Sequence, residues 1–104
     1  IKHRNLIEAG GKHYVWGAGA KGIAFANILD PDRKYIPVLV DINSRKQGDY
    51  ISLTGHPCVA PGEVDWDSLS ANDCLWIMNA RYKDEIIAAL PKGLACRVVT
   101  LGED

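Results

Sequence analysis

A glycine-rich turn near the start of the chain is the feature that most restricts how this sequence can fold. Residues 12–16 (KHYVW) have the β-branched and aromatic content of a short buried strand, and the sequence GAGAKG follows at once as residues 17–22. Apolar residues then recur at roughly helical spacing over residues 20–29. A GxGxxG pattern between a strand and a helix is typical of a Rossmann-like domain that holds the phosphate or ribose part of a nucleotide.

Each position of this turn has an expected role. Gly17 permits the tight turn, Gly19 lets a ligand approach the backbone where no Cβ intervenes, and Gly22 lets helix and strand pack closely. The amide groups at the start of the helix, around Ala20, then face an anion. Lys21 opposes the helix dipole, so an anionic ligand would explain it, and a solvated lysine is the alternative. For the glycines the alternative is a packing turn with no ligand.

Strands and helices are expected to alternate along the rest of the chain. We expect a helix end at 2–10, a strand at 35–40, a loop at 43–62 with a short extended piece at 56–59, a helical turn at 65–69, a strand at 73–79, a helix at 82–90 and a strand at 94–101. This order predicts a small Rossmann-like α/β domain of three layers, with a mostly parallel sheet of about four strands.

Further candidate ligand-binding residues follow the predicted strands. Asp41 lies about 20 residues past the glycines, where a carboxylate accepts hydrogen bonds from ribose hydroxyls; a turn aspartate that caps the next loop is an equal alternative. Asn43, Lys46 and Gly48 belong to that loop, which could close over a ligand or simply be solvated. Asn79 ends the third strand at the sheet edge where α/β domains bind ligands.

Composition and charge limit the other classes of function. The net charge of −1 and the lack of a basic cluster argue against nucleic acid as a partner. The sequence has no apolar run of about 20 residues, so we expect no membrane span. The three cysteines lack metal-ligand spacing, which predicts reduced thiols, a cytoplasmic location and no metal site. No catalytic histidine or serine motif is recognisable.

The chain of 104 residues is long enough for one hydrophobic core. We therefore expect a single Rossmann-like domain over residues 1–104. The sequence starts at Ile1 with what looks like the end of a helix, and this favours a domain excised from a larger chain.

Several of these segments together resemble a known family. The sequences VWGAGAKG (residues 15–22), VDIN (40–43) and KQG (46–48), with Gly55, Pro57 and Pro61, resemble the C-terminal domain of sugar C-methyltransferases. The resemblance covers the chain from about residue 12 onward. It implies a parent enzyme whose middle domain binds S-adenosylmethionine and carries the catalytic base. The present domain would then hold a nucleotide-linked sugar beside the remaining domains, with no cofactor and no catalytic residue of its own.

Two other functions remain open at this point. A nicotinamide dinucleotide-binding module would explain the glycine turn and Asp41, although a complete dinucleotide site needs two mononucleotide halves and this chain supplies little more than one. An interaction domain without a ligand is the third possibility, since a fold does not imply an activity.

Overall fold

The structure is a computed structural model, and it describes residues 2–102. Its centre is a parallel sheet of five strands in the order β3-β2-β1-β4-β5. The strands are β1 (His13–Trp16), β2 (Leu39–Val40), β3 (Cys58–Val59), β4 (Cys74–Ile77) and β5 (Arg97–Thr100), and every pairing is parallel. The predicted α/β class and parallel sheet are confirmed. The strand beyond the expected four is β3, which lies within the short extended piece predicted at 56–59.

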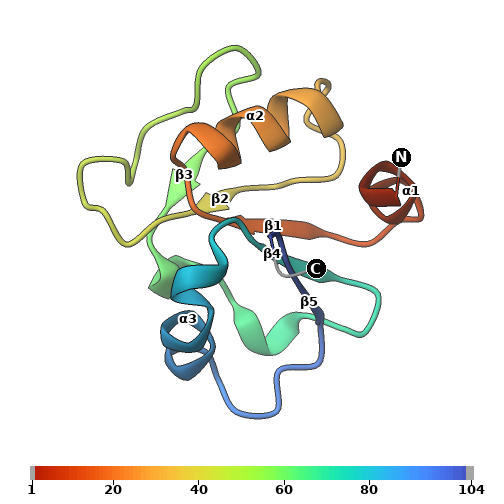
Figure 1. Ribbon diagram of the computed structural model, residues 1–104, viewed down its shortest axis with the longest axis vertical. Coiled ribbons are helices and arrows are strands. Elements are labelled where there is room, and N and C mark those ends of the chain that lie inside the picture. The colour runs from red at the N-terminus through yellow and green to blue at the C-terminus, as the bar shows by residue number, and fades with distance from the viewer. Residues whose placement is uncertain (1, 103–104) are drawn as a thin grey trace.

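Helices cover both faces of this sheet and give the expected three layers (Figure 1). Helices α1 (Lys2–Glu8) and α2 (Ala20–Leu29) lie on one face, and α3 (Lys83–Ala89) lies on the other. Short 3₁₀ turns occupy Pro61–Glu63, Trp66–Ser68 and Ala80–Tyr82, and the last of them leads directly into α3. None of the helices in the described part of the chain combines the length and apolar character that a membrane span needs.

Alternating side chains of the central strands supply two hydrophobic cores. Val15 and Trp76 point to the side of α1 and α2, where Phe25 is buried, whereas Trp16 and Leu75 point to the side of α3. The apolar stripe expected on α2 included Ile28 and not Phe25. In the structure Phe25 is buried and Ile28 is 62% exposed, so the buried face of the helix differs from the expected one. All three cysteines are free and buried, and burial raises the pKa of the Cys74 thiol to about 12.

Strand β2 is shorter than the predicted 35–40 because a carboxylate takes up the preceding backbone groups. Asp30, at the end of α2, accepts hydrogen bonds from the amides of Lys34, Tyr35 and Ile36. Pro37, which comes next, has no amide hydrogen to offer a neighbouring strand. Regular pairing therefore begins only at Leu39.

The same carboxylate is part of a buried polar network that the sequence did not reveal. His56 was expected in a loop, and it is indeed in one, but its side chain is fully buried. Its Nε2 lies 3.0 Å from Asp30 Oδ2, and its Nδ1 lies 2.6 Å from the hydroxyl of Thr54. Burial opposes ionisation of Asp30, but the hydrogen bonds from His56 and the three amides outweigh it and lower the pKa of Asp30. This network ties the loop before β3 to the end of α2.

A second buried histidine generates a prediction about pH. His13 Nε2 lies 3.0 Å from the carbonyl of Gly10, and its Nδ1 accepts a hydrogen bond from the Trp76 indole. These partners fix a neutral ring, and burial lowers the pKa of His13 below its ordinary value of 6.5. The unfolded chain therefore takes up a proton near pH 6.5 that the folded chain does not accept until lower pH.

The free energy of unfolding should accordingly fall as the pH drops below about 6.5, by about 1.4 kcal/mol for each unit of pKa lowering. Urea unfolding between pH 8 and pH 5 measures this slope. In His13→Gln both hydrogen bonds can still form and the titration is lost, so the slope should become shallower. An identical slope in the variant would contradict the assignment.

Candidate functional site

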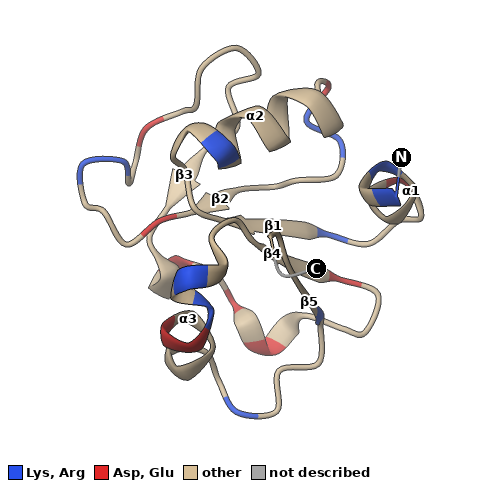
Figure 2. Ribbon diagram, in the orientation of Figure 1, with Lys and Arg blue, Asp and Glu red and all other residues tan. Residues whose placement is uncertain are grey.

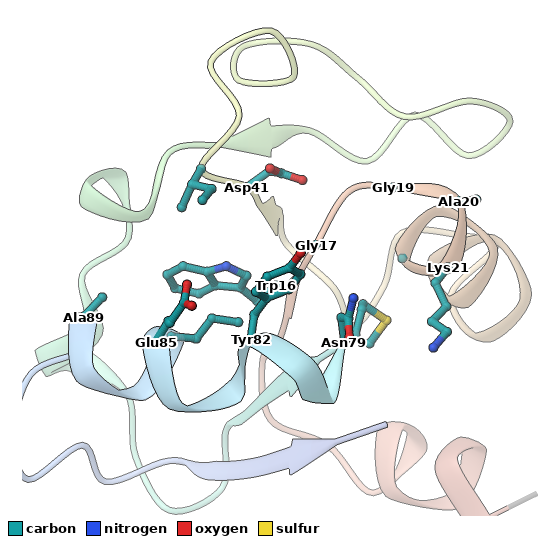
Figure 3. A pocket seen from close by; sticks show the side chains of 14 residues that line it. Trp16, Gly17, Gly19, Ala20, Lys21, Asp41, Asn79, Tyr82, Glu85 and Ala89 are labelled. Atoms are coloured by element: carbon teal, nitrogen blue, oxygen red, sulfur yellow. The ribbon is translucent and has the colours of Figure 1, made fainter. Parts of the chain in front are cut away.

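An open cleft of about 760 Å³ lies at the carboxyl edge of the sheet. It is located where the chain leaves β1 and β4, the two adjacent strands from which the strand order runs in opposite directions. Such a switch point is where open α/β sheets bind ligands. The cleft is lined by Trp16, Gly17, Gly19, Ala20, Lys21, Gly22, Asp41, Ile42, Met78, Asn79, Tyr82, Glu85, Ile86 and Ala89 (Figure 3).

Two glycines of the turn are required by the fold itself. Gly17 has a φ of +121°, which disfavours residues with a side chain. At Gly22, a Cβ would lie 1.7 Å from the carbonyl oxygen of Gly17, so the Gly17 backbone would have to move to make room for it. The predicted roles in the tight turn and in close helix–strand packing are therefore visible in the geometry.

Gly19 differs from these two glycines. Its φ of −82° and ψ of −168° suit any residue, and a Cβ placed there would have no atom within 4 Å. Packing therefore gives no reason for glycine at this position, which faces the open cleft. Gly19 is also the N-cap of α2, so the first amides of the helix, which have no acceptor within it, lie beside the same space.

The loop after β2 holds the glycine turn in place through side-chain contacts. Asp41 Oδ2 accepts a hydrogen bond from the amide of Ala18 at 2.8 Å, and its Oδ1 accepts one from the amide of Asn43 at 2.9 Å. Lys46 Nζ donates to the Ala18 carbonyl at 2.9 Å, and Gln47 donates to the Asp41 carbonyl. Both peptide groups of Ala18 are thus fixed from the neighbouring loop. The loop-capping hydrogen bond that was one alternative for Asp41 is present.

The structure brings together seven of the ten residues predicted as ligand-binding. The cleft is lined by Gly17, Gly19, Ala20, Lys21, Gly22, Asp41 and Asn79. The other three, Asn43, Lys46 and Gly48, lie outside its lining. Asn43 Oδ1 accepts a hydrogen bond from the amide of Arg45, Lys46 contacts the backbone of the turn, and Gly48, at a φ of +88°, donates to the carbonyl of Cys58.

Charge in the cleft is mixed. Lys21 is exposed and, within residues 2–102, makes no ion pair or hydrogen bond through its side chain. Asp41 and Glu85 are the carboxylates of the lining, while Asn79 caps the next turn by accepting a hydrogen bond from the amide of Arg81. Figure 2 shows acidic and basic residues interspersed over the molecule. Lys21 belongs to the first turn of α2. The cleft therefore has one cationic end, at the start of α2.

The opposite wall of the cleft was not anticipated from the sequence. Tyr82, Glu85, Ile86 and Ala89 lie three or four residues apart and share one face of the helical segment that ends in α3. The sequence predicted a helix at 82–90, but none of these four residues was predicted to bind a ligand. The signal was available, because a charged residue interrupts an otherwise apolar stripe.

These features define a Rossmann-like α/β domain with an open ligand-sized cleft beside a glycine turn. A family model described as C-methyltransferase C-terminal domain matches residues 4–97, and the chain belongs to this family. The resemblance of the glycine turn and the following loops to such domains is thereby confirmed. A search of curated proteins found no match.

The contrast between the two glycines on either side of Lys21 can be tested by paired substitutions. Gly22→Ala should lower the free energy of unfolding by at least about 2 kcal/mol, because displacing the Gly17 backbone costs more than the roughly 1 kcal/mol that alanine gains in a helix. Gly19→Ala should change it by less than about 1 kcal/mol. Urea denaturation followed by circular dichroism measures both. Equal losses in the two variants would contradict the distinction.

Proposed function

We propose that this chain is the C-terminal domain of a larger sugar C-methyltransferase and that its cleft holds the nucleotide part of a nucleotide-linked sugar. In this proposal S-adenosylmethionine binds in another domain of the parent chain, and the present domain contributes binding and no catalytic residue. The partners are the sugar nucleotide and the remaining domains. Family membership supports the methyltransferase setting, and the cleft supports a ligand.

The observation that carries the proposal is Gly19. Glycine is expected where a ligand must reach the backbone, and this position has neither a positive φ nor a neighbour that excludes a Cβ. The first amides of α2 point toward anions at this place, since the helix dipole adds a partial positive charge there. Lys21, in the first turn of the same helix, adds a full charge at the cleft lining.

The apolar part of the cleft suits the remainder of a nucleotide. Ile42 is 75% exposed and Tyr82 is 45% exposed, although both line the cleft. Trp16 stacks on Trp66 with the ring centroids 5.9 Å apart, so its indole is fixed in place at the floor. Binding of a planar base over aromatic and aliphatic surfaces of this kind is favourable, because it removes apolar surface from water.

The proposal predicts binding of nucleoside diphosphates to the 104-residue chain. Isothermal titration calorimetry should show saturable binding that weakens with salt, because Lys21 meets phosphate. Gly19→Ala should reduce the affinity about tenfold or more while leaving stability nearly unchanged, and Lys21→Gln should reduce it about three- to tenfold.

Lys92→Gln is the matched control for charge, since Lys92 lies outside the cleft lining. Its affinity should equal that of the unmodified chain. Absence of binding to every nucleoside diphosphate, or binding that neither Gly19→Ala nor Lys21→Gln affects, would overturn the proposal.

A further inference from the structure

Lys46 lies outside the lining of the cleft, yet its side chain contacts the backbone of the glycine turn. The side chain is half-buried, and its Nζ donates a hydrogen bond to the carbonyl oxygen of Ala18 at 2.9 Å. The next residue, Gln47, donates from its side chain to the carbonyl of Asp41 at 2.8 Å, which ties the loop to the end of β2. The ammonium group of Lys46 is therefore held against the turn.

The direction of this contact sets the direction of the next amide group. In a planar trans peptide, the C=O and the N–H point in opposite directions, and no peptide bond of the described residues is cis. The peptide between Ala18 and Gly19 turns its carbonyl toward Lys46, so the N–H of Gly19 points away from the loop. Gly19 lines the cleft, and within residues 2–102 its N–H has no acceptor. The Gly19 N–H is thus a free donor on the cleft side of the turn.

The opposite orientation of this peptide is open to Gly19. A flip would change the φ of Gly19 by roughly 180° from its value of −82°, to a positive value that glycine adopts readily. Asp41 does not prevent a flip, because it accepts from the N–H of Ala18, which belongs to the preceding peptide. Within residues 2–102, Lys46 is the donor that holds the Ala18 carbonyl. Without it, the carbonyl could turn into the cleft, where it would repel an anion.

We propose that Lys46 is a positioning residue that raises the affinity of the cleft for anionic ligands without contacting them. By holding the Ala18 carbonyl on the loop side, it keeps the Gly19 N–H directed into the cleft as a donor to a phosphate oxygen. The peptide is then ordered before the ligand arrives, which lowers the free-energy cost of binding. This inference rests on the proposed function, because that function places the phosphates at the start of α2.

The test measures the affinity of the 104-residue chain for TDP and for UDP by isothermal titration calorimetry. Lys46→Met removes the donor and keeps a side chain of similar length. It should weaken binding of both probes about five- to tenfold, because the flipped peptide then competes with the binding-competent one. Circular dichroism checks that the variant is folded.

Arg45→Met is the matched control, because Arg45 lies on the same loop, is exposed and makes no side-chain contact within residues 2–102. It removes the same charge and should leave the affinity unchanged. Salt separates positioning from direct contact. Added salt should still weaken binding in Lys46→Met but have less effect in Lys21→Gln, since of the two lysines only Lys21 lines the cleft.

NMR of the chain without ligand examines the peptide itself. In Lys46→Met, the carbonyl carbon signal of Ala18 should shift, and the HN–Hα coupling constants of Gly19, which report its φ, should change. In Arg45→Met they should stay as in the unmodified chain.

The outcomes separate the inference from the function on which it rests. If TDP or UDP binds but Lys46→Met binds it as tightly as the unmodified chain does, the role of Lys46 is overturned and the nucleotide site stands. Unchanged couplings of Gly19 in Lys46→Met would overturn that role as well. If neither probe binds to the unmodified chain, the proposed site and the inference fall together.

Discussion

The close approach of helix α2 to the end of strand β1 is the contact on which the rest of the structure depends. Gly22 lies so near the carbonyl of Gly17 that a single methyl group would occupy the same space. This close approach places the first turn of the helix beside the carboxyl edge of the sheet. At that edge β1 lies between β2 and β4. The cleft follows from this geometry, because α3 packs on the opposite face and leaves the edge open between them.

The loop after β2 makes that arrangement rigid. Asp41 and Lys46 hold the two peptide groups of Ala18 from one side, and Gly17 donates to the Val40 carbonyl at 2.7 Å from within the turn. Charged residues that sequence reasoning assigned to a ligand thus also act on the backbone of the turn. Lys21 and Glu85 are the charged residues of the lining whose side chains have no partner within residues 2–102, and they lie at opposite ends of the cleft.

Local patterns predicted much of the fold and part of the candidate site. The bounds of α2 follow from the glycine turn and from Asp30-Pro31, and the apolar runs locate β1, β4 and β5 to within a few residues. The short β2 was not predictable from its apolar run, because Asp30 takes up the amides that a longer strand would have used. The burial of His56 was not predictable either, because it depends on a contact with Asp30, which lies 26 residues earlier in the chain.

The sequence by itself determined the α/β class, the glycine turn and the family, because these rest on residues that are neighbours along the chain. Tertiary structure decided which residues of that pattern face the cleft. A Cβ at Gly17 would meet the Met78 side chain and one at Gly22 would meet the Gly17 backbone, whereas one at Gly19 would meet open space. Glu85 lines the cleft only because α3 packs on the sheet face beside it, a placement that the spacing of residues along the helix does not determine.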